Sequence, residues 1–108
     1  MERRLAAIMV VDMVAYSRRM NADEAGTLAL LQACRKKFIE PQIAAQAGRV
    51  VKLTGDGLLA EFPSAVEAVQ CAAKIQLALR EYDTGGAPVQ FRIGVNLGDI
   101  IVDDGDIY

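Results

Sequence analysis

The chain has 108 residues, with 12 basic and 14 acidic side chains, a net charge of −2 and no histidine. This is the length of one domain, and the near-neutral charge argues against bulk electrostatic binding to nucleic acid or to an anionic membrane. Without histidine, the chain has no Ser-His-Asp triad, Cys-His pair or histidine metal site, so its chemistry must use other groups or a bound metal. Apolar residues make up 53% of the chain, which suggests that a partner or further chain covers one face.

Residues 5–11 form a continuous apolar run, which predicts a strand buried on both faces. We expect a loop over residues 13–20. Asn21, with Glu24 three residues later, predicts a capping box at the start of a long helix. The apolar positions of that helix are Leu28, Leu31, Cys34 and Phe38.

Pro41 should kink or interrupt this helix, and Gly48 should end it. Residues 49–54 and 58–62 then read as two strands joined by Gly55-Asp56-Gly57. An Asp-Gly pair between apolar runs is typical of a β-hairpin.

Strand alternation predicts which side chains of the first hairpin strand share a face. Val51 and Leu53 are expected to point toward the helices. Val50, Lys52 and Thr54 are expected to point the opposite way.

Ser64 and Glu67 form a second capping box, which opens a helix to about Tyr82. Its predicted apolar stripe consists of Ala68, Val69, Ala72, Ile75 and Leu79. Cys34 and Cys71 lie in helical stretches and are too few for a disulfide scaffold, so we expect buried free thiols.

The next strand, residues 89–97, alternates, with Phe91, Ile93, Val95 and Leu97 on one face. Gly98 interrupts that alternation, so residues 100–102 are predicted to form a separate short strand. The apolar run at 5–11 is far shorter than the about 20 residues of a membrane-spanning helix. We expect no membrane insertion and a cytoplasmic location.

The order of these elements is β-α-β-β-α-β with one extra strand. It predicts an α+β fold of the ferredoxin-like type, an antiparallel sheet with its helices on one face. The other face then lacks a cover of its own. The sheet order places the first strand beside the hairpin, which matters for the acidic residues that end these elements.

Asp12 ends the first strand and Asp56 lies at the hairpin tip, so both are expected at one edge of the sheet. A carboxylate at the end of a buried strand needs a hydrogen bond, an ion pair or a metal. The simpler interpretation of Asp12 is a residue at the start of a loop that caps nearby amides. The simpler interpretation of Asp56 is a turn residue. The functional interpretation is a site for Mg²⁺ or Mn²⁺, which prefer oxygen ligands.

Two weaker signals occur near this pair in the sequence. Lys52, between apolar neighbours on its strand, is either a snorkelling edge lysine or a donor on the open sheet face. Tyr16 and Ser17 follow Asp12 shortly before a helix, where their amides are able to hold phosphate oxygens.

Four segments together resemble the catalytic domain of class III nucleotide cyclases, the adenylate and guanylate cyclase family. They read RLAAIMVVDMVAYS at 4–17, VKLTGDGLLAEF at 51–62, FRIGVNLGDI at 91–100 and GDIY at 105–108. Gly-Asp-Gly alone is a weak signal. The combination, in this order and spacing, covers nearly the whole chain.

The resemblance implies a role for each matching residue. Asp12 and Asp56 correspond to the metal-binding aspartates, and Met13 lends a backbone carbonyl to one of two Mg²⁺ or Mn²⁺ ions. Lys52 and Asp106 correspond to the pair that recognises adenine. In such a pair the lysine donates to adenine N1 and the carboxylate accepts from the adenine amino group. The phosphate-facing loop corresponds to Val14, Ala15, Tyr16 and Ser17.

The resemblance also implies a partner and a reaction. In the family a homodimer forms two composite sites, with the metal carboxylates from one chain and the base readers from the other. The ribose 3′ oxygen of ATP attacks the α-phosphorus, and cyclic AMP and pyrophosphate are released. Such an enzyme serves cyclic-nucleotide signal transduction.

The chain departs from the family pattern at functional positions. The Asn-Val-x-x-x-Arg motif, which supplies a transition-state Asn and Arg, does not occur, and a later phosphate-binding lysine is also missing. Asp99 stands where some relatives have an arginine. We therefore expect residues 1–108 to be the N-terminal part of a cyclase domain whose C-terminal part is missing, and to be inactive alone.

Two other interpretations remain open. One is a noncatalytic dimerisation or regulatory module on the cyclase fold, and the other is an unrelated ferredoxin-like domain that binds a small ligand. Diguanylate cyclases share the arrangement, but their hairpin carries a Gly-Gly-acid-Glu-Phe run and this one reads Gly-Asp-Gly-Leu.

Overall fold

Strand β1 (Glu2–Met13) runs through the middle of an antiparallel sheet in the computed structural model. The structure describes residues 2–103 and the backbone of 106–107. The strand order is β2-β3-β1-β4-β5, with β2 (Arg49–Leu53), β3 (Gly57–Phe62), β4 (Phe91–Asp103) and β5 (Asp106–Ile107). This is the ferredoxin-like arrangement that the element order predicts, and the α+β fold class is confirmed.

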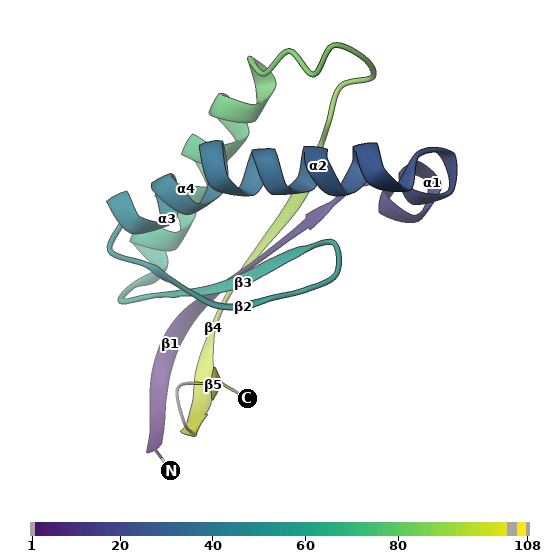
Figure 1. The fold of residues 1–108 in the computed structure, drawn as a ribbon. Coiled ribbons are helices and arrows are strands. Elements are labelled where there is room, and N and C mark those ends of the chain that lie inside the picture. Colours follow the sequence, from purple (N-terminus) through teal and green to yellow (C-terminus); the bar gives the residue numbers. More distant parts are fainter. Residues whose placement is uncertain (1, 104–105, 108) are drawn as a thin grey trace.

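The helices lie over one face of the sheet (Figure 1). They are α1 (Tyr16–Ala22), α2 (Glu24–Cys34), a π-helix η1 (Arg35–Ile39), α3 (Glu40–Ala45) and α4 (Ala65–Arg80). The main core fills the space between the helices and the sheet. Met9 and Val11 of β1, Leu58 of β3 and Ile75 of α4 are fully buried within it. No helix among the described residues is long and apolar enough to cross a membrane.

The predicted loop over residues 13–20 is wrong, because Tyr16 begins α1. Tyr16 packs against the core, and the guanidinium of Arg19 donates to the carbonyl oxygen of Pro88 over 2.6 Å. These contacts with distant residues stabilise a segment whose local sequence is ambiguous. The cap of α2 is also not Asn21 but Asp23, whose carboxylate accepts from the amide of Gly26 over 2.9 Å.

The interruption predicted at Pro41 takes the form of a π-helix. The helical path continues from α2 to α3, and η1 ends two residues before Pro41. Proline has no amide hydrogen and its ring crowds the preceding turn, so a wider turn there is a natural accommodation. The helical path ends close to Gly48, but the left-handed residue is Ala47, with φ of 61°.

The predicted faces of Val50 and Val51 are exchanged. Val50 packs against the main core, whereas Val51 packs with residues of the opposite, open face. The pairing of β2 with β3 shifts between Val50 and Lys52, which is a β-bulge. A bulge adds one residue to one strand and changes the parity of alternation. Lys52, opposite Leu59 of the open-face cluster, and Leu53, opposite the buried Leu58, keep their predicted faces.

Two further predictions need correction. Val69, assigned to the apolar stripe of α4, is 56% exposed, although Ala68, Ile75 and Leu79 are buried. Gly98 does not end a strand: β4 is continuous, and Gly98 pairs with Ala6 within a register that extends along nearly all of β1. Continuous pairing with β1 on both sides of Gly98 keeps β4 extended at the glycine. Ser64 caps α4 through the amide of Glu67, as expected.

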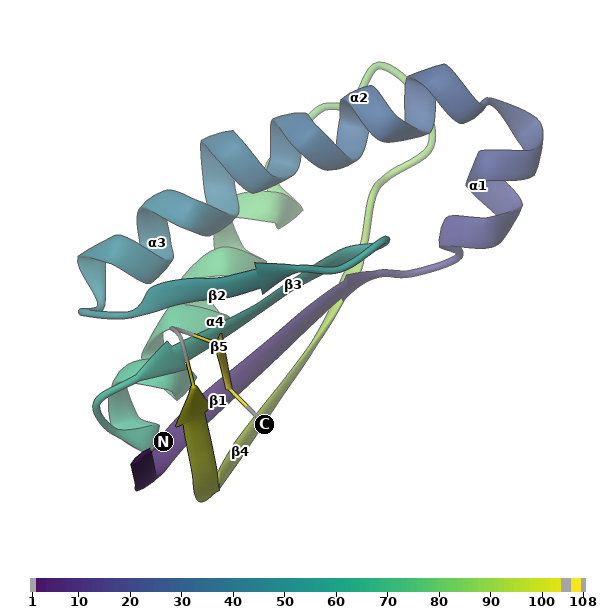
Figure 2. The same cartoon turned by 60° about the horizontal axis from the view of Figure 1, so that its bottom comes forward.

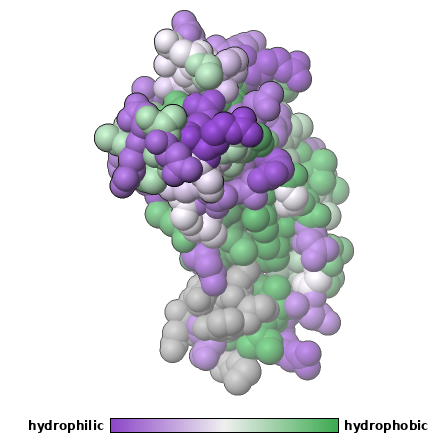
Figure 3. Space-filling model, turned by 90° about the vertical axis from the view of Figure 1, so that its right-hand side faces the viewer, coloured by the Kyte–Doolittle hydropathy of each residue, from purple (hydrophilic) through white to green (hydrophobic). Residues whose placement is uncertain are grey.

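The open face has a smaller apolar cluster. Ala6 and Ile100 are buried there, packed against Ile8, Val51, Leu59 and Val102. The curl of the sheet brings β5 close to β2, although these strands are at opposite edges of the hydrogen-bonded order (Figure 2). Val10 on the same face remains 42% exposed, and hydrophobic side chains gather on the side of the molecule seen in Figure 3.

Glu61 joins three strands of this sheet. Its side chain is only 7% exposed. One guanidinium nitrogen of Arg4, on β1, donates to both carboxylate oxygens over 2.7 and 2.9 Å. Arg49, on β2, donates to the same carboxylate. The buried charge is therefore paired on both sides, as burial of a carboxylate requires.

Candidate active site

The structure brings the end of β1 and the tip of the β2–β3 hairpin together, as the strand order predicts. Asp12 pairs in register with Gly57, the residue after Asp56. The backbone amide of Met13 donates to the carbonyl oxygen of Asp56 over 2.9 Å. The two aspartates are therefore backbone neighbours at one edge of the sheet, although 44 positions separate them in sequence.

This close approach requires glycine at position 57. A Cβ atom on Gly57 would lie 1.7 Å from the carbonyl oxygen of Val11 and 2.9 Å from the Cα atom of Asp12. Nothing lies within 4 Å of the corresponding position on Gly55. The sequence indicates that both glycines serve the turn, but the structure shows that Gly57 admits the hairpin against β1.

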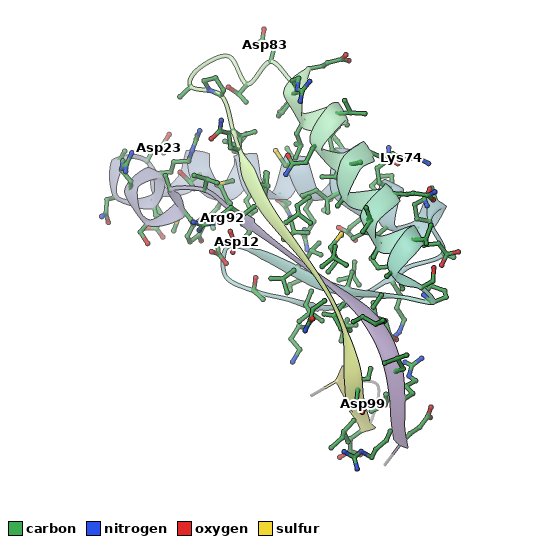
Figure 4. The ribbon with its side chains drawn as sticks, turned by 180° about the vertical axis from the view of Figure 1, so that it is seen from behind. Asp12, Asp23, Lys74, Asp83, Arg92 and Asp99 are labelled. Carbon is green, nitrogen blue, oxygen red and sulfur yellow. The ribbon has the colours of Figure 1, made fainter. Side chains whose placement is uncertain are left out.

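Arg92 is the residue at this edge that the sequence analysis did not single out. It lies directly opposite Asp12 in the β1–β4 register, and its Nε donates to Asp12 Oδ1 over 3.0 Å. Figure 4 shows the two side chains beside each other, with Asp99 toward the other end of β4. The signal was present, because alternation places Arg92 on the polar face of its strand and the fold places that strand beside β1.

The segment from Val14 to Ser17 turns the chain from β1 into α1. The amide of Val14 donates to the carbonyl oxygen of Gln90 over 2.9 Å. Ala15 has a left-handed conformation, with φ of 59°, which is uncommon for a residue with a side chain. Tyr16 packs against the core and Ser17 is exposed. The predicted phosphate loop thus directly follows the first aspartate as a tightly turned segment.

The two predicted base readers belong to strands that the curled sheet brings close together. Lys52 is exposed on β2, on the open face. The backbone of Asp106 pairs with Asp103 at the start of β5, and β5 comes close to β2. The side chain of Asp106 lies outside the described residues, so its role as a base reader stays a prediction.

The donor set at the sheet edge fits a hard divalent cation that arrives with a phosphate ligand. Among residues 2–103, no three His, Cys, Asp or Glu side chains gather into a group that could hold a metal ion. The site has two carboxylates, from Asp12 and Asp56, beside the backbone of Met13. Mg²⁺ is commonly held by one or two carboxylates together with substrate phosphates, and the side chain of Asp12 is 32% exposed.

Comparison with known proteins shows which proteins are similar to this chain in sequence and fold. No protein-family model matches the sequence. The chain is 51% identical over 110 residues to the putative adenylate cyclase 3 of Rhizobium meliloti, which covers 98% of this chain and 19% of that protein. It is 44% identical to an adenylate/guanylate cyclase/hydrolase from Silicibacter pomeroyi, with a TM-score of 0.89 over 99% of this chain and 64% of that one.

More distant structures share the fold. The guanylyl cyclase Cya2 is 24% identical, with a TM-score of 0.81 over 98% of this chain and 62% of that one. The ferredoxin-like sheet with its helices on one face is thus the fold of nucleotide cyclase domains. The chain belongs to the class III nucleotide cyclase family. It spans 19% of its curated relative and 64% of the Silicibacter chain.

Proposed function

We infer that this chain is the N-terminal part of an adenylate cyclase domain, which converts ATP to cyclic AMP and pyrophosphate in cyclic-nucleotide signalling. The convergence of Asp12 and Asp56 at one sheet edge carries the proposal. The 44% identity to a protein named adenylate/guanylate cyclase supports it. In the reaction, the ribose 3′ oxygen attacks the α-phosphorus and the pyrophosphate leaves.

Asp12, Asp56 and the backbone carbonyl of Met13 would hold two Mg²⁺ or Mn²⁺ ions. When bound, these ions lower the pKa of the attacking hydroxyl and offset the negative charge of the triphosphate. The amides of Ala15, Tyr16 and Ser17 would face the phosphates from the turn into α1, since that of Val14 already donates to Gln90. The hydrogen bond from Met13 to Asp56 keeps the backbones that carry the two aspartates in one fixed relation, which supports the preorganisation that such chemistry needs.

Lys52 and Asp106 select adenine in this proposal. A lysine donates to N1 of adenine and a carboxylate accepts from its amino group, whereas guanine presents the reverse pattern. Lys52 and Asp12 both lie on the open face, which also exposes part of Val10. Pairing of two chains across this face would combine the carboxylates of one chain with the base readers of the other and would cover apolar surface.

The test is an assay of cyclic nucleotide formation by a longer protein that contains this chain, supplied with ATP or GTP and Mn²⁺. We expect cyclic AMP from ATP and at least a hundredfold loss in Asp12→Asn. Cyclic GMP as the preferred product would make the protein a guanylate cyclase. Unchanged nucleotide with a stable dimer would favour the alternative, a noncatalytic dimerisation or regulatory module.

A further inference from the structure

The carboxylate of Asp12 forms an ion pair with an arginine of the same chain, Arg92. Arg92 and Asp12 are directly opposite each other on neighbouring central strands, and their 3.0 Å contact is both a hydrogen bond and an ion pair. The Arg92 side chain is 70% exposed and that of Asp12 is 32% exposed. A guanidinium therefore occupies one oxygen of a carboxylate that the proposed function assigns to a divalent ion.

The pair also affects the charge of the sheet edge. The backbone brings Asp12 and Asp56 to one edge of the sheet, so two negative charges belong to this edge. Arg92 supplies a positive charge at the same carboxylate that a divalent ion would use.

We propose that Arg92 competes with free divalent cations for Asp12, so that the ion binds tightly only together with a nucleotide. The proposal rests on the proposed function, because it takes Asp12 as a metal ligand. Arg92 is a positioning residue in this scheme and not a catalytic one. It holds the carboxylate when no ion is bound and opposes an ion that comes alone.

The exposure of Arg92 makes this exchange possible. A surface ion pair of this kind contributes little to stability, so the guanidinium leaves Asp12 at little cost. Phosphate oxygens are strong acceptors for arginine. A bound triphosphate therefore offers Arg92 another partner at the moment when the ion takes its place on Asp12.

The test measures Mn²⁺ affinity of the 108-residue chain by calorimetry, first without nucleotide. Arg92→Gln should bind Mn²⁺ about threefold to tenfold more tightly than the natural chain, because a unit charge no longer repels the ion from a few ångström away. Arg92→Lys keeps the charge and should stay within about twofold of the natural chain. Added salt should reduce the gain.

Arg80→Gln is the matched control, because it removes the same charge from an exposed position on α4. It should leave Mn²⁺ affinity unchanged. With a non-hydrolysable ATP analogue present, the gain in Arg92→Gln should shrink. Circular dichroism and thermal unfolding check that each variant keeps the fold.

Equal or weaker Mn²⁺ binding by Arg92→Gln, including no detectable binding in either protein, overturns the competition. The same result in Arg80→Gln as in Arg92→Gln would reduce the effect to net charge and overturn it as well. Asp12→Asn distinguishes this failure from that of the proposed function. If Asp12→Asn binds Mn²⁺ as the natural chain does, the metal site itself is absent.

Discussion

The backbone amide of Met13 donates to the carbonyl oxygen of Asp56 over 2.9 Å. This bond joins the residue after one aspartate to the other aspartate itself. The position of the hairpin tip is thus set by the end of β1, and a disturbance of this contact should affect stability and the site together.

Replacement of Gly57 tests that coupling. The Cβ atom in Gly57→Ala would overlap the carbonyl oxygen of Val11, so the hairpin must move away from β1. We expect a loss of about 2–3 kcal/mol in the free energy of unfolding, with weaker Mn²⁺ binding. Urea unfolding and calorimetry measure these changes. Gly55→Ala is the control, since its Cβ would meet nothing within 4 Å. Similar effects of both substitutions would contradict the prediction.

Glu61→Gln should destabilise the sheet. The carboxylate is buried and accepts from Arg4 and Arg49, and loss of its charge weakens both pairs. We expect a decrease of roughly 1–2 kcal/mol, since both arginines are about half exposed and regain water. Chemical unfolding measures it. Glu2→Gln removes the exposed partner of the same Arg4, at 3.9 Å, and should cost under about 0.5 kcal/mol. A larger loss of stability for Glu2→Gln than for Glu61→Gln would contradict the assignment of Glu61 as the main partner of Arg4.

The thiols of Cys34 and Cys71 should be unreactive in the folded chain. Both are buried, as predicted, and burial raises each pKa to about 11 from 9.0, although Arg19 and Lys37 oppose the rise at Cys34 and Lys74 opposes it at Cys71. Labelling with a disulfide reagent at pH 8 should be slow until denaturant is added. Rapid labelling of the folded chain would contradict the buried position.

The same shifts predict how stability depends on pH. A thiol whose pKa is higher in the folded chain stabilises the fold below the unfolded value, and this contribution is lost as pH rises from about 9 to about 11. Other groups also make stability depend on pH, so the Cys34→Ala, Cys71→Ala double variant is the control. An identical pH profile for both proteins would show that the thiols contribute nothing.

Lys52→Glu should lower the preference for ATP over GTP in the longer protein. A site built for one hydrogen-bonding pattern leaves buried groups unpaired with the wrong base, which costs several kcal/mol. The ratio of kcat/KM for the two nucleotides measures the change. Lys36→Glu, an exposed position on η1, makes the same charge change and should leave the ratio as it is. A natural protein that prefers GTP would overturn the assignment of Lys52.

Residues 1–108 alone should have no measurable cyclase activity. The charge that develops on the transferred phosphoryl group needs preorganised donors, and loss of one commonly costs about 10²–10³ in rate. The Asn, Arg and Lys of the family pattern are absent from this sequence. A cyclic AMP assay beside a longer protein that contains the chain tests this. Comparable turnover would show that the catalytic donors lie within these 108 residues.

Local patterns in the sequence determined much of this molecule. Alternating and continuous apolar runs predict the strands, and the Asp-Gly pair predicts the hairpin. Ser64 with Glu67 predicts the start of α4. The order of elements then gives the sheet order, from which the meeting of Asp12 with Asp56 follows. Each of these local signals involves residues that are close together in the sequence. Each depends on backbone preference and on the burial of apolar side chains.

Only the tertiary structure decided the features that depend on contacts between distant residues. The bulge that exchanges Val50 and Val51 arises from pairing with β3. Tyr16 begins a helix because it packs on the core, and Arg92 reaches Asp12 across 80 positions. A local pattern carries no information about such partners, because the energy of each contact exists only when the chain has closed the loop between them.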